Sequence, residues 1–348
     1  MEVPRFGTDG IRGVADVELT PELVHALGRA AARVMRADRF LVGRDPRRSG
    51  PALQAALSAG LAAEGCAVVD LGVLPTPAVA FGSATLGAPA AMVSASHNRF
   101  SDNGVKLFAT GGHKLDDATE AAIEAELHAI LAGRPAAATT PAGGIVIDTE
   151  LLGTYVEHLR SSLEGRRLSG LRVVLDCANG AASMVAPAVF AGLGAAVEVI
   201  ADQPDGTNIN QDCGSTHPEG LASAVAAAGA DVGLAFDGDA DRVLAVDRRG
   251  ALVDGDQLLG LLALDRAARG RLVGGTVVVT VMANLGLRRA MVAAGISVQE
   301  TPVGDRHVLA ALATGGWSLG GEQSGHLIFP ELATTGDGIL TGLQVLDV

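Results

Sequence analysis

Three aspartates occupy alternate positions in the segment FDGDADR, residues 236–242. The segment follows DVGLA, a run typical of a buried strand, so an extended loop would present Asp237, Asp239 and Asp241 on one side. Carboxylate oxygens suit a hard cation such as Mg²⁺, which often keeps a phosphate among its ligands. An EF-hand calcium loop is excluded, because it needs glycine at the position that Arg242 occupies. The segment therefore predicts a magnesium site, and a solvated acidic turn is the alternative.

A second polar segment, VSASHNRFSDNGVKLF at residues 93–108, contains two candidate nucleophiles, Ser94 and Ser96. Adjacent residues of an extended segment point to opposite sides, so we do not expect His97 to deprotonate Ser96. A phosphoryl group on Ser96 would carry a charge of about −2 and need a counter-ion, which the aspartate loop can bind. Lys106, one of two lysines in the sequence, can exchange a proton near neutral pH if its pKa is lowered, as arginine cannot.

Two glycine-rich segments add groups that bind anions and sugars. In RFGTDGIRG, the glycines let backbone N–H groups approach an anion, and Arg12 can bind phosphate oxygens bidentately. A plain N-terminal turn is the alternative. In GGEQSGH, Glu322, Ser324 and His326 present a carboxylate, a hydroxyl and an imidazole at alternate positions, a set suited to sugar hydroxyls or an amino group. A hairpin with incidental polar residues is the alternative there.

The elements that must position these groups follow one pattern three times. A β-branched run meets a polar turn, and then an alanine-rich helical segment ends at Gly65, Gly194 or Gly295 before a second β-branched run. Strand, helix and strand in that order indicate a βαβ unit. The first helix is marked by Thr20 as N-cap and Pro21 at its first position. The predicted fold class is α/β, with three tandem related domains and mostly parallel mixed sheets.

Domain boundaries follow from loss of periodicity. LAGRPAAATTPAGG, residues 131–144, indicates a linker. A second boundary is predicted near residues 246–257, where a hairpin precedes a helix beginning near Asp256. We divide the chain into domain 1 with the serine loop (1–140), domain 2 with the metal loop (145–246) and domain 3 with the sugar loop (247–348).

Composition limits the partners and the location. A net charge of −13 would repel a nucleic-acid backbone, so nucleic acid is excluded. No apolar run reaches the roughly 20 residues of a membrane span, and the first residues contain no leader, so we expect neither a membrane protein nor a secreted one. Three cysteines without a CxxC pair favour the cytoplasm. The expected partner is a small molecule; the sequence does not reveal the oligomeric state, so a homodimer is the assembly to test.

In chain order, FGTDGIRG, SASHN, DGDADR and GGEQSGH together resemble the α-D-phosphohexomutase superfamily, and the resemblance runs through the whole chain. Gln323, where phosphomannomutase-like members typically carry methionine, makes the sequence most similar to the branch acting on glucosamine phosphates. The resemblance implies that Ser96 is a phosphoserine that phosphorylates glucosamine 6-phosphate. The resulting glucosamine 1,6-bisphosphate would reorient and return its other phosphate to Ser96, which leaves glucosamine 1-phosphate.

The resemblance also implies roles for the other motif residues. One Mg²⁺ per chain would be bound by Asp237, Asp239, Asp241 and an oxygen of the phosphate on Ser96. Arg12 and Lys106 would stabilise charge on the transferring group and help with protons. The implied substrate-binding residues are Glu322, Ser324, His326 and Arg242, which also supports the metal loop, with Asp305 and Arg306 of TPVGDR. His97 and Asn98 would shape the turn.

Two departures from the superfamily pattern affect these expectations. Arg99 follows Asn98, where proline is usual, so a φ constraint is lost and we expect a less ordered loop. Members usually continue for about one further domain, of the order of 100 residues, carrying a phosphate-binding loop, whereas this sequence ends at GLQVLDV. We therefore expect both sites to form and turnover to be weak or absent.

Three alternatives remain open from the sequence. The first is phosphomannomutase or phosphoglucomutase activity. The second is a catalytically idle protein that binds phosphosugars. The third is an acyl hydrolase using Ser96 and Lys106, which would leave the aspartates of residues 237–241 without a role.

Overall fold

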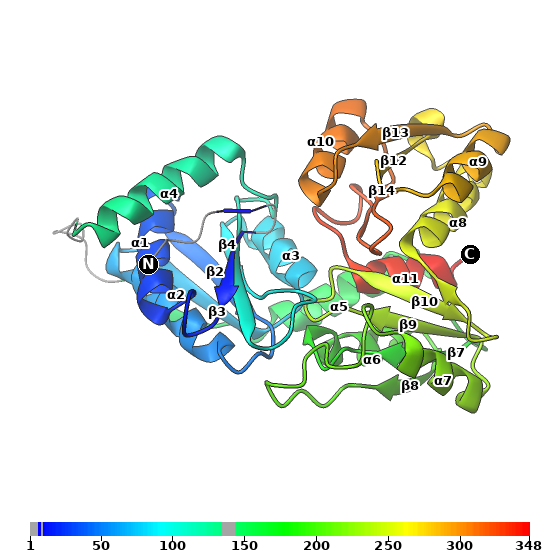
Figure 1. The fold of residues 1–348 in the computed structure, drawn as a ribbon, viewed down its shortest axis with the longest axis horizontal. Coiled ribbons are helices and arrows are strands. Elements are labelled where there is room, and N and C mark those ends of the chain that lie inside the picture. The colour runs from blue at the N-terminus through cyan, green and yellow to red at the C-terminus, as the bar shows by residue number, and fades with distance from the viewer. Residues whose placement is uncertain (1–5, 8–9, 134–142) are drawn as a thin grey trace. The chain divides into compact units, whose positions relative to one another are not determined.

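The computed structural model describes residues 6–7, 10–133 and 143–348, and the chain forms two compact units (Figure 1). Unit 1 extends to Gly153 and includes the excursion Pro204–Ile209, and unit 2 contains Thr154–Gln203 and Asn210–Val348. Each unit is described by itself.

Unit 1 contains a six-stranded sheet in the order β1-β5-β4-β2-β3-β6. The pairs β4–β2, β2–β3 and β3–β6 are parallel, and β1–β5 and β5–β4 are antiparallel, so the predicted mixed sheet with mostly parallel strands is confirmed. Its elements are β1 (Ile11–Val14), α1 (Pro21–Met35), β2 (Arg39–Arg44), α2 (Gly50–Ala63), β3 (Ala67–Val73), α3 (Thr76–Leu86), β4 (Ala90–Val93), β5 (Asp102–Phe108), α4 (Asp117–Leu131) and β6 (Ile145–Ile147).

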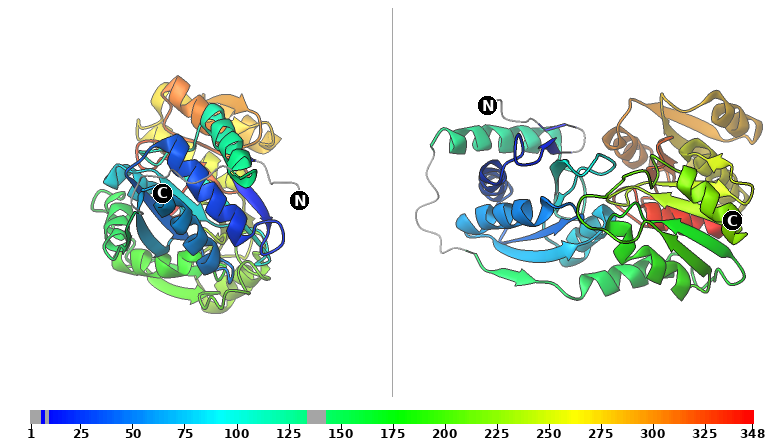
Figure 2. Two further views of the ribbon diagram at one scale, coloured as in Figure 1. Left: turned by 90° about the vertical axis from the view of Figure 1, so that its left-hand side faces the viewer. Right: turned by 60° about the horizontal axis from the view of Figure 1, so that its bottom comes forward.

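Helices cover both faces of this sheet. Figure 2 shows α1 between α4 and α2 on one face, where Phe40 and Val42 of β2 join their apolar residues in one core. Successive residues of a strand point to opposite faces, so Leu41 faces the other side, where α3 packs on β2 and β4. Strands with nearly continuous apolar sequences expose apolar side chains on both faces of a sheet, so both faces must be packed against helices.

Unit 2 contains two sheets, in the orders β11-β10-β9-β7-β8 and β13-β12-β14-β15. Each combines parallel and antiparallel pairs. The elements are α5 (Leu151–Ser161), whose first turn lies in unit 1, β7 (Arg172–Asp176), the 3₁₀ turn η1 (Ala181–Met184), α6 (Ala186–Gly192), β8 (Ala196–Ile200), α7 (Glu219–Ala228), β9 (Val232–Phe236), β10 (Val243–Asp247), β11 (Leu252–Val253), α8 (Gly255–Ala268), the 3₁₀ turn η2 (Val273–Gly275), β12 (Thr276–Thr280), α9 (Leu285–Ala293), β13 (Ser297–Thr301), α10 (Asp305–Gly315), β14 (Gly320–Gly321), β15 (Leu327–Ile328) and α11 (Gly338–Leu346).

The helix α11 joins the two sheets of unit 2 into one body. It contacts β9 and β10 of the first sheet and β15 of the second, and it also packs on α8. Close approach needs a small residue, because a Cβ at Gly342 would lie 2.8 Å from a methyl carbon of Leu234. Residues near the end of the chain therefore help to fix the loops of both sheets.

The predicted βαβ units are all present, as β2-α2-β3, β7-α6-β8 and β12-α9-β13, each with parallel strands. Gly65, Gly194 and Gly295 follow the helices with φ of 87°, 95° and 70°, in the left-handed region that favours glycine. Thr20 caps α1 by accepting from the N–H of Leu23 at 3.3 Å, as expected. The expected hairpin is β10–β11, and the expected helix, α8, begins at Gly255.

The predicted linker lies largely outside the described residues. Residues 145–147, which the sequence division placed in domain 2, form β6 and pair with β3 at the edge of the first sheet. The division into three domains remains a prediction.

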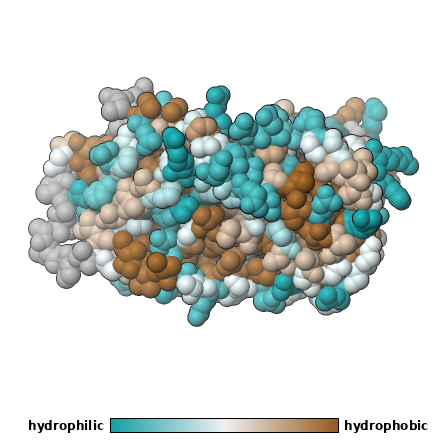
Figure 3. All heavy atoms as spheres, turned by 90° about the horizontal axis from the view of Figure 1, so that it is seen from below, coloured by the Kyte–Doolittle hydropathy of each residue, from teal (hydrophilic) through white to brown (hydrophobic). Residues whose placement is uncertain are grey.

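Within the described ranges, the structure contains no helix long and apolar enough to cross a membrane. Apolar side chains on the face shown in Figure 3 form separate patches between hydrophilic ones.

A buried polar pair fixes the start of α11. Tyr155 of α5 donates its hydroxyl to Oδ2 of Asp337 at 2.6 Å, and Oδ1 of Asp337 accepts from the N–H of Leu340 as the helix N-cap. Burial raises the pKa of the Asp337 carboxyl to about 6, against the opposing effect of these hydrogen bonds. The pair ties the first helix of unit 2 to its last.

We predict that Asp337→Asn removes a pH-dependent loss of stability. A carboxyl whose pKa rises from 3.8 to about 6 on folding binds its proton more tightly in the folded state, so the free energy of unfolding falls as pH rises between these values. The stability of the variant relative to the parent should therefore rise by up to roughly 3 kcal/mol between pH 4 and pH 7. Urea unfolding with EDTA present, followed by circular dichroism, measures this difference.

The matched control is Asp116→Asn, at another aspartate N-cap. Asp116 is exposed, and the hydrogen bond from the Thr119 N–H lowers the pKa of its carboxyl. Its contribution to stability is lost only as pH falls below about 3.8, so the stability of Asp116→Asn relative to the parent should change little between pH 4 and pH 7. If the free energy of unfolding changes with pH in the same way in the parent and in Asp337→Asn, the prediction is contradicted.

Candidate active site

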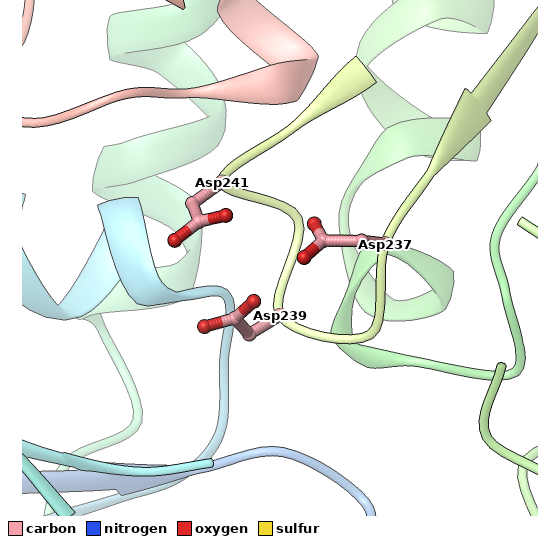
Figure 4. Close-up of side chains that lie close together, drawn as sticks. All are labelled: Asp237, Asp239 and Asp241. Carbon is pink, nitrogen blue, oxygen red and sulfur yellow. The ribbon is translucent and has the colours of Figure 1, made fainter. Parts of the chain in front are cut away.

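The three aspartates of the 237–241 segment converge in the turn between β9 and β10 (Figure 4). One ligand oxygen from each of Asp237, Asp239 and Asp241 lies within 4.8 Å of the others, and all three residues are buried. The sequence therefore correctly predicted that these carboxylates meet.

The reason that they meet differs from the expected one. The segment is a tight turn rather than an extended loop, because the N–H of Ala240 donates to the carbonyl of Asp237 at 3.0 Å. Ala240 has a φ of 58°, in the left-handed region that a non-glycine residue rarely adopts. Curvature of the turn, not alternation along a strand, brings the side chains together.

Neighbouring segments hold this turn from both sides. The N–H of Ala181, at the start of η1, donates to the carbonyl of Gly238 at 2.9 Å, and the N–H of Gly338, at the start of α11, donates to the carbonyl of Ala240 at 2.9 Å. A Cβ at Gly338 would lie 2.3 Å from the carbonyl oxygen of Arg242, so only glycine fits there. The strained turn is thus supported by backbone contacts.

Asp176 supports the same region, and it was missed from the sequence. It ends β7, next to β9, and its two oxygens accept from the N–H groups of Ala178 at 2.9 Å and Gly214 at 2.8 Å. Burial raises the pKa of its carboxyl, although both hydrogen bonds oppose that shift. A signal was available, because an aspartate directly after a buried parallel strand lies at the sheet edge where sites form.

The donor set of the turn fits a hard divalent cation. Three buried carboxylates repel one another, and a cation that binds all three relieves that repulsion. Arg242 lies beside two of them: its backbone N–H donates to Oδ1 of Asp237 at 3.2 Å, and its Nε lies 3.7 Å from Oδ1 of Asp241. Asp237, Asp239 and Asp241 are therefore the residues that could hold a metal.

The serine segment forms a buried loop between β4 and β5 of unit 1. Oγ of Ser94 donates to Oδ2 of Asp45 at 2.6 Å and accepts from the N–H of Ser96 at 2.9 Å. Ser96 has a φ of 51°, so the chain turns sharply at this residue. The Ser94 hydroxyl thus connects the Asp45 carboxylate to the loop backbone at Ser96, which is a structural role.

The expectation about His97 is wrong. Nδ1 of His97 lies 3.3 Å from Oγ of Ser96, within hydrogen-bonding reach. The expectation assumed an extended segment, and the left-handed conformation of Ser96 instead turns the two neighbouring side chains toward each other. Asn98 shapes the turn as expected, because its Nδ2 donates to Oδ2 of Asp102 at 2.9 Å.

Asp45 and Arg47, which sequence reasoning missed, lie beneath this loop. Both side chains are fully buried, and Nε of Arg47 donates to Oδ2 of Asp45 at 2.8 Å. Burial raises the pKa of the Asp45 carboxyl, while Arg47 and Ser94 act in the opposite direction. Asp45 follows β2 and Ser94 follows the adjacent parallel strand β4, so their meeting could have been inferred from the strand order.

Arg12 and Lys106 lie on neighbouring strands. Arg12 of β1 stands directly opposite Gly104 of β5, so these two residues share a face of the sheet. Lys106 is two residues further along β5 and therefore lies on the same face. Met92 of β4, opposite Lys106, shares that face too. Lys106 is buried and Arg12 is partly exposed. Of the motif around Arg12, residues 8–9 lie outside the described part of the chain.

The GGEQSGH segment is the turn of the hairpin β14–β15. Oε1 of Glu322 accepts from the N–H of Gly304, in the predicted sugar-facing loop, at 3.1 Å. Oγ of Ser324 is buried and has no hydrogen-bond partner among the described residues. Gln323 is exposed, and its carbonyl accepts from the N–H of Gly255 at 3.1 Å. Glu322 thus connects the two loops that were expected to contact the sugar.

His326 connects the hairpin β14–β15 to the turn that contains Asp241. Its Nδ1 lies 3.7 Å from Oδ1 of Asp241, and its Nε2 lies 3.5 Å from Oδ2 of Asp305 and accepts from the N–H of Gly336 at 3.2 Å. Burial lowers the pKa of this imidazole, but Asp241 and Asp305 outweigh burial and raise it. Asp305 is buried at the start of α10, and Arg306 is partly exposed.

Comparison with protein-family models matches nearly the whole chain. Three models of phosphoglucomutase/phosphomannomutase alpha/beta/alpha domains match it, domain I at residues 4–134, domain II at 153–250 and domain III at 254–348. The three models match in chain order.

Individual relatives agree with the family models. The phosphoglucosamine mutase of Rhodococcus opacus strain B4 is 53% identical over 348 residues, which cover 98% of this chain and 78% of that protein. The phosphoglucosamine mutase of Moorella thermoacetica is also 53% identical, covering 99% of this chain and 78% of that protein. Among solved structures, a phosphoglucomutase/phosphomannomutase family protein from Burkholderia thailandensis superposes with a TM-score of 0.85 at 28% identity, covering 98% of this chain and 76% of that one.

We predict that Asp239→Asn abolishes stabilisation by Mg²⁺ without weakening the metal-free protein. In EDTA the variant should be at least as stable as the parent, because it removes one of three repelling charges. Saturating Mg²⁺ should raise the melting temperature of the parent and not that of the variant. Asp38→Asn, at an exposed aspartate of unit 1, is the charge-matched control and should keep the response. An unchanged Mg²⁺ response in Asp239→Asn would overturn the metal assignment.

Proposed function

Because the chain belongs to the phosphoglucomutase/phosphomannomutase family of enzymes, we propose that it interconverts glucosamine 6-phosphate and glucosamine 1-phosphate. The observation that carries the proposal is the convergence of Asp237, Asp239 and Asp241, whose buried carboxylates suit a metal-assisted phosphoryl transfer. The choice of an amino sugar is supported by the relatives at 53% identity, which are phosphoglucosamine mutases, and by Gln323.

We propose Ser96 as the phosphoryl carrier. The bond between Ser96 Oγ and phosphorus would break as a bond forms from phosphorus to the 1-oxygen of glucosamine 6-phosphate, which loses its proton. The 1,6-bisphosphate would then return its 6-phosphate to Oγ, releasing glucosamine 1-phosphate. The support for Ser96 over Ser94 is that the Ser94 hydroxyl is already engaged with Asp45 and with the Ser96 N–H.

Charge and protons must be managed during transfer. Asp237, Asp239 and Asp241 would hold Mg²⁺, and the ion would supply positive charge that compensates the transferring group. Arg12 and Lys106, on one face of the first sheet, would stabilise the same charge, with Lys106 exchanging the hydroxyl proton. His97, whose Nδ1 is 3.3 Å from Ser96 Oγ, can return a proton to Oγ when the phosphoryl group leaves.

We assign sugar recognition to the hairpin β14–β15 and the loop before α10. Ser324 has a buried hydroxyl without a partner among the described residues, so a sugar hydroxyl can pair with it. Glu322 can bind the ammonium group of glucosamine while it holds Gly304. His326 and Asp305, whose Nε2 and Oδ2 lie 3.5 Å apart, would hold the hairpin and this loop together. Arg306, the next residue after Asp305, would add a positive charge for the substrate.

Three other functions are tested by the same experiments. Phosphomannomutase or phosphoglucomutase activity would use the same sites on another sugar. An idle phosphosugar-binding protein would bind substrate without transfer. The contact between His97 and Ser96 gives an acyl hydrolase some support, but that function leaves the buried aspartate cluster without a role.

The first test is the intact mass of the protein after incubation with glucosamine 1,6-bisphosphate and Mg²⁺. We expect the mass increment of one phosphate in the parent and in Ser94→Ala, and none in Ser96→Ala. A parent that never acquires phosphate would remove Ser96 from the mechanism. Acylation of Ser96 by an activated ester, without phosphorylation, would favour the hydrolase.

The second test concerns the sugar. Glu322→Gln keeps an oxygen for the Gly304 N–H but loses the charge that an ammonium group recognises, so kcat/KM for glucosamine 6-phosphate should fall about ten- to a hundredfold. The value for glucose 6-phosphate, which has no ammonium group, should change much less. A coupled assay primed with glucosamine 1,6-bisphosphate measures both. Equal losses on the two sugars would contradict the role of Glu322, and a parent that prefers glucose or mannose 6-phosphate would contradict the choice of glucosamine.

A further inference from the structure

Arg47 is a fully buried arginine whose side-chain hydrogen bonds, among the described residues, go to the serine loop and to Asp45. Its Nε donates to Oδ2 of Asp45 at 2.8 Å. One terminal nitrogen donates to the carbonyls of Ser96 at 2.7 Å and Asn98 at 2.9 Å. The other donates to the carbonyls of Arg99 and Asp102, the latter at 3.1 Å.

These five acceptors match the number of N–H groups that a guanidinium carries. Four of them are backbone carbonyls from residues 96–102, and they lie around one planar group. A guanidinium holds its donors in a fixed fork, so the arrangement of the carbonyls is fixed by the arginine rather than by the loop alone. The loop is therefore built around the Arg47 side chain.

The loop needs such support for two reasons. Ser96 has a φ of 51°, a conformation that a non-glycine residue keeps only where its surroundings enforce it. Residue 99, which follows Asn98, is an arginine and not a proline, so no ring restricts φ at that position. The hydrogen bonds from Arg47 to the carbonyls on both sides of this position supply a restraint from outside the loop.

We propose that Arg47 is a positioning residue for phosphoryl transfer, which holds Ser96 in the left-handed conformation that orients its Oγ. The inference rests on the proposed role of Ser96 as the phosphoryl carrier. Arg47 acts through the loop backbone, because its guanidinium donates to backbone carbonyls of the loop and to Asp45. Its guanidinium shape matters for this role as well as its charge.

The variant that separates shape from charge is Arg47→Lys. Lysine keeps the ion pair with Asp45 and so avoids a buried uncompensated carboxylate, but its single ammonium group has three donors and cannot pair with all five acceptors. Arg48→Lys is the matched control, because Arg48 is the next residue and its side chain is exposed. If Arg47→Lys fails to fold, the double variant Asp45→Asn, Arg47→Gln takes its place in the comparison. The double variant removes both buried charges, so neither is left without its partner.

Hydrogen exchange tests the hold of Arg47 on the loop without any reaction. The amides of Ser96, Asn98 and Asp102 are protected by hydrogen bonds within the loop. In Arg47→Lys they should exchange at least tenfold faster, while Arg48→Lys and the helices of unit 1 keep the parent rates. Exchange at the parent rate in Arg47→Lys would overturn the proposal, whether or not Ser96 is phosphorylated.

The rate of phosphorylation then tests whether Arg47 positions Ser96 for phosphoryl transfer. Intact mass measures the rate at which glucosamine 1,6-bisphosphate phosphorylates Ser96. In Arg47→Lys the maximal rate should fall at least tenfold, while the concentration of glucosamine 1,6-bisphosphate that gives half of that rate should change little. In Arg47→Ala, millimolar guanidinium should restore part of the rate and ammonium should not. A loosened loop with an unchanged rate would overturn the positioning role. A parent that is never phosphorylated would instead refute the proposed function, and the positioning role with it, leaving the exchange result as evidence on the loop alone.

Discussion

Repulsion among three carboxylates held within 4.8 Å of one another is the constraint on which the chemistry of unit 2 depends. Without a cation this arrangement is unfavourable, so side-chain preferences cannot create it. It exists because the backbone of the turn is fixed by its neighbours, with Ala181 bonding Gly238 on one side and Gly338 bonding Ala240 on the other. The three carboxylates are thus positioned by main-chain contacts from distant parts of the sequence.

The serine loop of unit 1 follows the same physical logic with different groups. A strained residue, Ser96, is stabilised by a buried side chain that does not belong to the loop, the guanidinium of Arg47. Asp45 accepts hydrogen bonds from that guanidinium and from the Ser94 hydroxyl, so three polar side chains pair with one another beneath the loop. Buried polar groups of this kind are tolerated when nearly every donor and acceptor is paired.

Close contact between a serine and a histidine is not enough to define a chemistry. Ser96 and His97 lie within hydrogen-bonding reach, as a hydrolase would require. The same contact would serve a phosphoserine, whose oxygen must regain a proton after transfer. The choice between them comes from the rest of the chain, since an acyl hydrolase has no use for three buried aspartates and a phosphoryl transferase does.

The sequence by itself determined the elements and the chemistry-bearing motifs. Strand and helix patterns, the glycines after three helices and the N-cap of α1 are local, so periodicity and turn chemistry sufficed to predict them. The convergence of the three aspartates was also predicted, although from an extended loop, whereas the observed turn brings them together by its curvature.

Only the tertiary structure decided how these motifs are held. The contact of His97 with Ser96 depends on a positive φ that no pattern reveals, and the support from Arg47 depends on hydrogen bonds to residues about 50 positions away. The link from His326 to Asp241 joins two different sheets. Such contacts come from the packing of one segment on another, and the spacing of residues along a chain does not specify that packing.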